Sequence, residues 1–405
     1  MVILVLNCGS SSVKYQVIDM KSADNNLLAK GQIERIGLND GILVHKPVGK
    51  PDYRITKPIP DHTVAINLIL NVIIDPVHGV LSSFADVNAV GHRVTHGGEY
   101  FTDSAIVTET VKQHIQNCID LAPLHNPANL KGILAIENLL PTIQQVAVFD
   151  TSYHQTIPPE NFLYAIPYRY YEDMRIRKYG FHGTSHKYVA KKACKTYGVD
   201  FNNSKIITCH IGNGGSVTAI LNGESINTSM GFTPVDGLMM GTRCGSIDPS
   251  VLLYIADNEG LNTSKINDLI NKESGLYGVA GISSDMRDNL QASDDGNKKA
   301  RLALNIFNNR VKEFIGSYAA LLGGVDMIVF TGGIGEHDMF VRHGACTNME
   351  YMGIKINEEV NYDAWGIDVE ISTPDSKVKV VVTKTDEEYV IASDTYRLLS
   401  NKFED

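Results

Sequence analysis

The sequence predicts a mixed α/β fold that contains two related halves. Several buried-strand patterns, such as residues 144–149 (QQVAVF) and 325–330 (VDMIVF), stop abruptly at polar or glycine residues. Helical patterns lie between them, at residues 185–198 and 303–324. Strands that alternate with helices are typical of an α/β fold. Because ligands of such folds gather at the carboxyl ends of strands, we expect the functional residues there.

Composition excludes several classes of protein. The chain has 405 residues, enough for two or three domains, and a net charge of −10. A global attraction to nucleic acid or to anionic membranes is therefore not expected.

The N-terminal apolar run is too short for a signal peptide, and no apolar stretch is long enough to span a bilayer. The six scattered cysteines form no CxxC pair, which favours a reducing cytoplasm over a zinc or redox site.

A distant internal repeat supports the two halves. Residues 3–19 (ILVLNCGSSSVKYQVID) resemble residues 206–223 (IITCHIGNGGSVTAILNG) in layout. Each segment reads as a strand, a turn of small polar residues and a second strand. Two hairpins can look alike by chance. The alternative is a duplicated domain, with each half presenting one phosphate-binding hairpin to a shared cleft.

The first hairpin has the residue types that bind phosphate. Glycine lets a ligand approach the backbone, serines add hydroxyl donors, and Lys14 adds a mobile positive charge. The pattern GxxxxGK[ST] is absent from the chain, and no GxGxxG is complete. A polar hairpin turn remains the alternative for this stretch alone.

Two arginines lie in glycine-rich segments rather than on helix faces. Arg93 lies in GHRVTHGG and Arg243 in GLMMGTRCGSIDP. A solvated surface arginine is the usual explanation for either one. Together with a phosphate hairpin they favour a clamp for an anion, since guanidinium groups stabilise a phosphoryl group in transfer.

The segment RKYGFHGTSH carries two histidines, His182 and His186. Zinc spacing would need both on one helix, and the neighbouring glycines argue against a helix there. Thr184 or Ser185 is expected to cap the helix that follows. We therefore expect His182 to donate to a carbonyl or phosphoryl oxygen, and His186 to be structural.

Two acidic residues have ambiguous roles. Asp150 follows a strand, so it is either a turn residue or a group that orients a substrate, the arginines or magnesium. Glu387 follows a strand end and begins a helix, where Thr385 and Glu388 fit a capping box. Glu387 either favours the helix dipole or holds magnesium through water.

The motifs together resemble the acetate kinase family, within the sugar kinase/Hsp70/actin-like superfamily. Seven occur in the family's order over nearly the whole chain: NCGSSSVK, GHRVTHGGE, FDTSYHQTIP, KYGFHGTSH, HIGNGGS, GLMMGTRCGSIDP and GGIGE. The resemblance implies duplicated ribonuclease H-like domains around a central nucleotide cleft. It places one domain at residues 1–152 with about 388–405, and the other at 153–387. It also implies a homodimer.

The implied activity is reversible phosphoryl transfer from ATP to acetate, giving acetyl phosphate and ADP, with Mg²⁺ or Mn²⁺. A carboxylate acceptor is already ionised at neutral pH, so direct in-line transfer needs charge neutralisation and placement rather than a strong base. The resemblance assigns catalysis to Arg93, Asp150, His182 and Arg243. It assigns the metal to Asn7 and Glu387. It assigns the acyl pocket to Thr95, Leu124, Phe181 and Pro234, beside Arg93.

The remaining residues that the resemblance assigns bind phosphate or nucleotide. They are Ser10, Ser12 and Lys14 in the first hairpin; His210, Ile211, Gly212, Asn213 and Gly214 in the second; and Asp285, Met286, Arg287, Gly333, Ile334, Gly335, Glu336 and His337 on the adenosine side.

The sequence departs from the family pattern at four positions. Thr95 replaces a common valine in the acyl pocket, and its hydroxyl must be satisfied. Cys244 and Ser246 replace serine and aspartate beside Arg243, and Asp386 adds a carboxylate beside Glu387.

Three alternatives remain open at this point. One is a kinase for propionate or butyrate, since discrimination by one methylene is only about 1–3 kcal/mol. Another is a nucleotide-driven binding protein of the actin and Hsp70 type. A sugar kinase is the third, although it would need a catalytic base for a hydroxyl.

Overall fold

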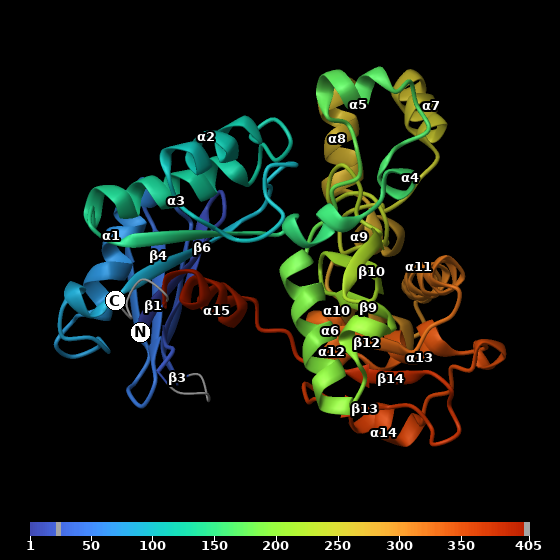
Figure 1. The fold of residues 1–405 in the computed structure, drawn as a ribbon. Coiled ribbons are helices and arrows are strands. Elements are labelled where there is room, and N and C mark those ends of the chain that lie inside the picture. Colours follow the sequence, from blue (N-terminus) through green and yellow to red (C-terminus); the bar gives the residue numbers. More distant parts are fainter. Residues whose placement is uncertain (22–25, 401–405) are drawn as a thin grey trace. The chain divides into compact units, whose positions relative to one another are not determined.

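The computed structural model describes residues 1–21 and 26–400, which form two compact units. Unit 1 comprises Met1–Ser152 and the chain from Asp386, and unit 2 comprises Tyr153–Thr385. Figure 1 labels many of their elements and colours the chain by residue number. Among the described residues no helix is both long and apolar enough to cross a membrane.

Unit 1 contains an eight-stranded sheet with the order β5-β4-β3-β2-β1-β6-β8-β7. Its strands are β1 (Val2–Cys8), β2 (Ser12–Asp19), β3 (Asn26–Glu34), β4 (Gly41–Pro47), β5 (Tyr53–Lys57), β6 (Ala89–Val94), β7 (Ala105–Ile106) and β8 (Gln144–Phe149). Its helices are α1 (His62–Ile73), the short η1 (Phe84–Asp86), α2 (Glu109–Asn117), α3 (Asn126–Leu139) and α15 (Glu387–Ser400).

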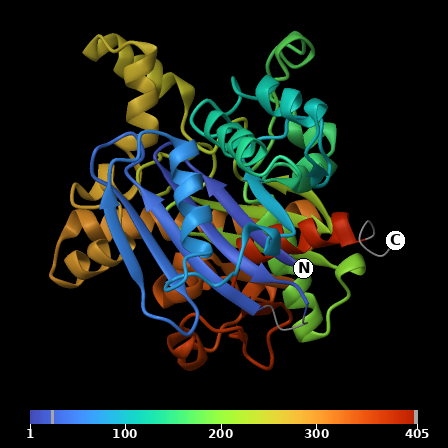
Figure 2. The same ribbon diagram turned by 90° about the vertical axis from the view of Figure 1, so that its left-hand side faces the viewer.

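Helices cover both faces of this sheet because successive strand residues point to opposite sides. Leu4 and Leu6 pack in one apolar cluster with residues of α1 and α3. Ile3 and Val5 pack on the other face against α15. Figure 2 looks onto the sheet with α1 lying across its strands. β1 is consequently apolar at almost every position, as expected for a strand buried on both faces.

Unit 2 contains a six-stranded sheet with the order β11-β10-β9-β12-β14-β13. Its strands are β9 (Lys205–Ile211), β10 (Gly215–Leu221), β11 (Glu224–Thr228), β12 (Met327–Thr331), β13 (Val369–Glu370) and β14 (Lys379–Val382). Its helices are α4 (Pro159–Phe162), α5 (Arg169–Met174), α6 (Gly183–Tyr197), α7 (Pro249–Glu259), α8 (Thr263–Lys272), α9 (Gly275–Ala280), α10 (Met286–Asp294), α11 (Lys298–Leu322), α12 (Gly332–His337), α13 (Met339–Cys346) and α14 (Glu358–Asp363). Short helices are η2 (Ser152–Thr156), η3 (Phe201–Asn203) and η4 (Glu350–Met352).

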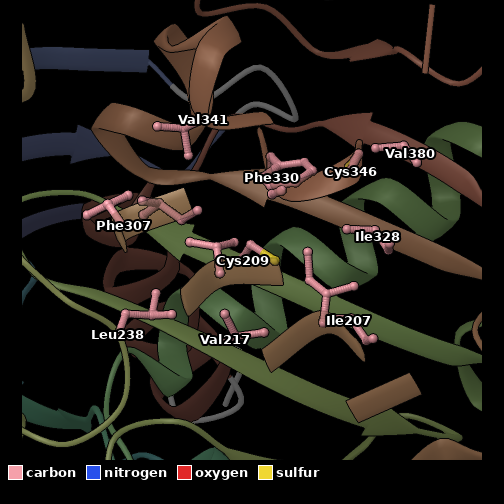
Figure 3. Close-up of a cluster of buried hydrophobic side chains, with 14 of the residues drawn as sticks. Ile207, Cys209, Val217, Leu238, Phe307, Ile328, Phe330, Val341, Cys346 and Val380 are labelled. Atoms are coloured by element: carbon pink, nitrogen blue, oxygen red, sulfur yellow. The ribbon is translucent and has the colours of Figure 1, made fainter. Parts of the chain in front are cut away.

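The sheet of unit 2 is also buried on both faces. Cys209 and Ile328 belong to a cluster that includes Phe307 of α11, which Figure 3 shows in close-up. Val329 lies on the opposite face, in a cluster with Val189 of α6.

The two sheets share one topology. The order β3-β2-β1-β6-β8 in unit 1 matches β11-β10-β9-β12-β14 in unit 2. In each sheet, the first three strands of this order are antiparallel to their neighbours. The last two strands run parallel to the first strand of the hairpin, which is β1 in unit 1 and β9 in unit 2. The predicted duplication and the α/β fold class are therefore confirmed.

Both helices that the periodicity predicted are present as α6 and α11. The cap expected for α6 was wrong. His182, with a left-handed φ of 57°, is the N-cap residue, and Thr184 and Ser185 lie inside the first turn. A non-glycine residue at positive φ is uncommon and is held there by its surroundings.

The capping box expected at Thr385 and Glu388 was also wrong, because Asp386 caps α15. The Oδ1 atom of Asp386 accepts from the backbone N–H of Tyr389 at 3.0 Å. We expect Asp386→Ala to lower the free energy of unfolding by about 1 kcal/mol, and Asp386→Asn to change it little, since asparagine caps equally well. Urea unfolding of the two variants and the parent measures this, and equal losses in both would remove the capping assignment.

Candidate functional site

The predicted residues of unit 1 meet at one edge of its sheet. β1, β6 and β8 are mutually parallel, so their carboxyl ends lie together. Asn7 is near the end of β1, Arg93 near the end of β6, and Asp150 directly follows β8. This is the edge at which the sequence placed them.

Arg93 and Asp150 form a bidentate ion pair. Arg93 Nε donates to Asp150 Oδ1 at 3.1 Å, and Nη2 donates to Oδ2 at 2.6 Å. The Asp150 side chain is 4% exposed and that of Arg93 is 26% exposed. The neighbouring Asp150 charge raises the pKa of Arg93 above its ordinary value, so the guanidinium stays charged. Arg93 Nη1 also donates to Asn7 Oδ1 at 3.4 Å. The aspartate therefore fixes the orientation of the arginine.

Glu387, at the start of α15, adds a second carboxylate to this group. Burial raises the pKa of Glu387; Arg93 lowers it and Asp150 raises it again. Asn7, Asp150 and Glu387 thus supply oxygen donors of the kind that Mg²⁺ prefers, and Mg²⁺ commonly keeps waters and uses one or two carboxylates with substrate phosphates. The donor chemistry fits that ion, although the described residues contain no cluster of three or more metal-ligating His, Cys, Asp or Glu side chains.

The raised pKa of Glu387 gives a stability prediction. The folded state holds the proton more tightly than the unfolded state, so stability falls as pH rises through the window between the two pKa values and stays lower above it. We expect Glu387→Gln to raise Tm at pH 7, with a gain that shrinks below the ordinary pKa of 4.5 that the carboxyl has in the unfolded chain. Calorimetry at several pH values measures it, and a gain that grows toward low pH would contradict it.

The first hairpin presents its polar residues at the same strand end. Asn7 pairs with Lys14 across β1 and β2, and both Ser10 and Lys14 are exposed. The turn is closed by Gly9 N–H donating to the Ser12 carbonyl at 2.8 Å.

The four predicted acyl-pocket residues are divided between the units. Thr95 is buried in unit 1, and its backbone N–H donates to the Asn129 side chain at 3.0 Å. Leu124, also in unit 1, is 63% exposed. In unit 2, Phe181 is buried with Met230 and Met240. Pro234 is half-buried, and its carbonyl accepts from Arg243.

His182 is held by a hydroxyl and by a second ring. Its Nδ1 lies 2.9 Å from Ser216 Oγ, and its ring stacks on that of His210 with centroids 4.3 Å apart. His210 is itself bonded through Nδ1 to Ser185 Oγ at 2.8 Å. His182 therefore lies beside the second hairpin, whose first strand ends with His210 and Ile211.

Arg243 is positioned against the same hairpin. A β-carbon at Gly214 would come within 3.3 Å of Arg243 Nη1. The Nη1 atom donates to the Pro234 carbonyl at 3.3 Å and approaches Met240 Sδ at 3.6 Å. Burial lowers the pKa of Arg243. Within residues 1–21 and 26–400 no carboxylate pairs with it, in contrast to Arg93. Its charge is available to an anion.

Cys244 and Ser246, the two residues beside Arg243 that depart from the family pattern, make contacts close to them in the chain. Ser246 Oγ donates to Asp236 Oδ1 at 2.7 Å and accepts from the backbone N–H of Gly237 at 3.1 Å. Cys244 Sγ contacts the Gly245 carbonyl at 3.1 Å. Both side chains thus support the loop that carries Arg243.

A pocket of about 1110 Å³ in unit 2 connects the second hairpin with the predicted adenosine side. Its volume suits a small-molecule or cofactor site. The predicted residues that line it are Gly212, Asn213, Asp285, Met286, Arg287, Gly333, Ile334 and His337.

Glu336, by contrast, has a structural environment. It is buried, and its Oε1 accepts from the backbone N–H groups of Gly332 and Thr385, both at 3.0 Å. Ile211, Gly214 and Gly335 do not line the pocket either.

The aromatic side of this pocket was not predicted from the sequence. Phe340, Tyr362 and Trp365 line it, and they are 47%, 68% and 67% exposed. The Trp365 ring contacts the His337 ring edge-on, with the ring centroids 5.2 Å apart. The chain's only tryptophan, in the polar stretch NYDAWGID, was the available signal.

Comparisons with known proteins agree over nearly the whole chain. The model of the acetokinase family matches residues 2–393. The acetate kinase of Caldanaerobacter subterraneus subsp. tengcongensis is 51% identical over 400 residues, covering 98% of this chain and 99% of that protein. The crystal structure of Porphyromonas gingivalis acetate kinase superposes with a TM-score of 0.95 at 48% identity, covering 98% of this chain and 99% of that one. A propionate kinase from Francisella tularensis subsp. tularensis SCHU S4 gives 0.89 at 39% identity, covering 98% and 99%.

The duplicated fold and these relatives define a phosphotransferase enzyme that uses a nucleotide. The chain belongs to the acetokinase family.

Proposed function

We propose that this protein catalyses the reversible transfer of the γ-phosphoryl group of ATP to acetate, giving acetyl phosphate and ADP. The observation that carries the proposal is the pocket of unit 2, which joins the glycine-rich turn at Gly212 and Asn213 to an aromatic wall. Such a pocket suits a nucleoside at one end and its phosphates at the other. The identity of the acceptor rests on the relatives named acetate kinase.

We further propose that the residues of both units act in one reaction, and that the two units are the protein's two domains. The acceptor carboxylate is already ionised, so no base is required. Arg93, which Asp150 holds in place, neutralises the carboxylate. Arg243 and His182 stabilise charge on the phosphoryl group in transfer, while the serines and Lys14 of the first hairpin bind phosphate. We assign recognition of the methyl group to Thr95, Leu124, Phe181 and Pro234.

Asn7 and Glu387 would hold Mg²⁺, with Mn²⁺ as a substitute. When bound, the ion neutralises phosphate charge. Asp150 already accepts two hydrogen bonds from Arg93. Within the described part of the chain Glu387 has no such contact with an arginine, which favours Glu387 over Asp150 as the carboxylate that binds the metal.

A homodimer and a cytoplasmic location complete the proposal. α7 has no buried residue, and its Leu253 and Tyr254 are 67% and 70% exposed. An apolar helix face of this kind is typical of a protein contact. All six cysteines are free thiols, as expected in a reducing compartment.

A hydroxylamine trap tests the reaction. Purified protein, ATP and Mg²⁺ are mixed with acetate, propionate or butyrate, and acyl hydroxamate is measured. We expect the strongest signal with acetate and a decline with chain length. The strongest signal with a longer acid would retain the mechanism and change the substrate. No signal with any acid, while ATP is bound or hydrolysed, would favour a nucleotide-driven binding protein.

A further inference from the structure

A chain of four side chains runs from the core of unit 2 to His182. Thr208 Oγ1 on β9 lies 2.7 Å from His186 Nδ1, and His186 Nε2 lies 2.7 Å from Ser216 Oγ. Ser216 Oγ, on β10, then lies 2.9 Å from His182 Nδ1. Thr208, His186 and Ser216 are completely buried. Only the last residue belongs to the proposed catalytic set.

The Ser216 hydroxyl has one proton for two ring nitrogens, so the chain has two possible directions. In the first, Thr208 donates to His186 Nδ1, His186 Nε2–H donates to Ser216, and Ser216 donates to His182 Nδ1. In the second, every bond is reversed, and His182 Nδ1–H donates to Ser216. A neutral histidine has one N–H donor and one acceptor nitrogen, so each direction fixes both tautomers.

Thr208 decides between the directions. Among the described residues its hydroxyl has His186 Nδ1 as its hydrogen-bond partner and no other. The second direction would leave the Thr208 hydroxyl proton buried without an acceptor, which is unfavourable. In the first direction the Thr208 proton has an acceptor, and each of the three hydrogen bonds has one donor.

The surroundings of His186 keep its ring neutral, so it has one N–H donor and one acceptor nitrogen. Burial lowers the pKa of His186 well below its ordinary value, and His154 and His210 lower it further. The rings that face it are those of His154, His182 and His210, with centroids 5.9, 6.4 and 6.2 Å away. A second proton on His186 is therefore not available to reverse one bond alone.

We infer that Thr208, His186 and Ser216 are positioning residues that hold His182 as its Nε2–H tautomer. The inference rests on the proposed function, in which His182 donates to the phosphoryl group. With Nδ1 accepting from Ser216, His182 has its single N–H at Nε2 and presents a neutral donor there. The reversed chain would present a lone pair to an anionic group.

Nitrogen NMR of the full-length protein tests the tautomer directly. The histidines are labelled with ¹⁵N, and the His182 signals are assigned by their loss in His182→Gln. We expect an unprotonated shift at Nδ1 and a protonated shift at Nε2. A proton on Nδ1 in the parent protein would overturn the inference.

Variants of the chain test its cause. Ser216→Ala should convert His182 to a mixture of tautomers, whereas Thr218→Val should not. Thr218 is a matched control, because it lies two residues along β10, is equally buried, and bonds instead to Thr228 Oγ1 at 2.9 Å. An unchanged His182 spectrum in Ser216→Ala would overturn the inference.

Kinetics provide a rescue experiment at the far end of the chain. Thr208→Val removes the hydroxyl, and we expect kcat to fall at least about tenfold with little change in the KM for ATP, since a wrong histidine tautomer is costly. Thr208→Ser should restore most of the loss. Equal kcat values in the two variants would contradict the inference.

The two proposals fail differently. Near-normal turnover in His182→Ala would remove the catalytic role of His182, whatever its tautomer. Collapsed turnover in His182→Ala, together with a proton on Nδ1 in the parent, would retain that role and remove only the positioning chain.

Discussion

Arg243→Ala is expected to lower kcat by about 10³-fold or more while the fold remains intact. The guanidinium lies against Gly214 of the second hairpin and is bonded only to the Pro234 carbonyl and Met240 sulfur among the contacts described above. Burial without a carboxylate partner disfavours the charged form of Arg243, as its lowered pKa indicates. A buried guanidinium without a carboxylate partner is strongly stabilised when an anion binds beside it.

Arg310→Ala is the matched control for this variant. Arg310 lies on α11, is 45% exposed and pairs with Glu313, so its loss should leave kcat unchanged. Both variants are compared by steady-state kinetics and by thermal unfolding. Because an unpaired and partly buried charge is removed, Arg243→Ala should not lower Tm. Turnover near that of Arg310→Ala would refute the role of Arg243 as an anion clamp.

The fold was largely readable from the chain because both sheets are buried on two faces. Strands such as β8 and β12 appear as short apolar runs that end at polar or glycine residues, and period 3.6 identifies α6 and α11. The internal repeat was visible because its strands are also apolar runs that end at polar turns. The two hairpins use the same alternation of apolar strands and small polar turns.

The helix caps could not be read in the same way. Thr385 and Glu388 have the spacing of a capping box, yet Asp386 accepts the bond, and Thr385 lies 2.8 Å from Ser185 Oγ, 200 residues away. Several side chains near the start of α15 can cap it, and contacts distant in sequence decide which one does.

The sequence indicated the strand ends at which the candidate residues lie, but it did not indicate which side chains contact one another. Arg93 and Asp150 were both identified, but 57 residues separate them, and only the parallel pairing of β6 and β8 brings them into a bidentate contact. The same holds for Ser216, an ordinary strand residue in sequence. It bridges His182 and His186 only because β10 packs beside α6 in the folded unit.

Arg93→Ala should abolish most turnover and also destabilise unit 1, and the two effects can be separated. Removing the arginine leaves Asp150, which is 4% exposed, as an uncompensated buried carboxylate. Breaking a buried pair in this way costs about 3 kcal/mol of unfolding free energy. The double variant Arg93→Ala/Asp150→Asn has no such charge, so most of that stability should return.

Activity should not return with stability, because the double variant still lacks the guanidinium that we propose neutralises the acceptor carboxylate. Urea unfolding and the hydroxamate assay on the parent, both single variants and the double variant complete a thermodynamic cycle. Asp150→Asn alone should keep Arg93 partly oriented through one remaining acceptor oxygen and retain more turnover than Arg93→Ala. Recovery of turnover in the double variant would show that Arg93 serves only to balance Asp150, and its proposed part in catalysis would then be wrong.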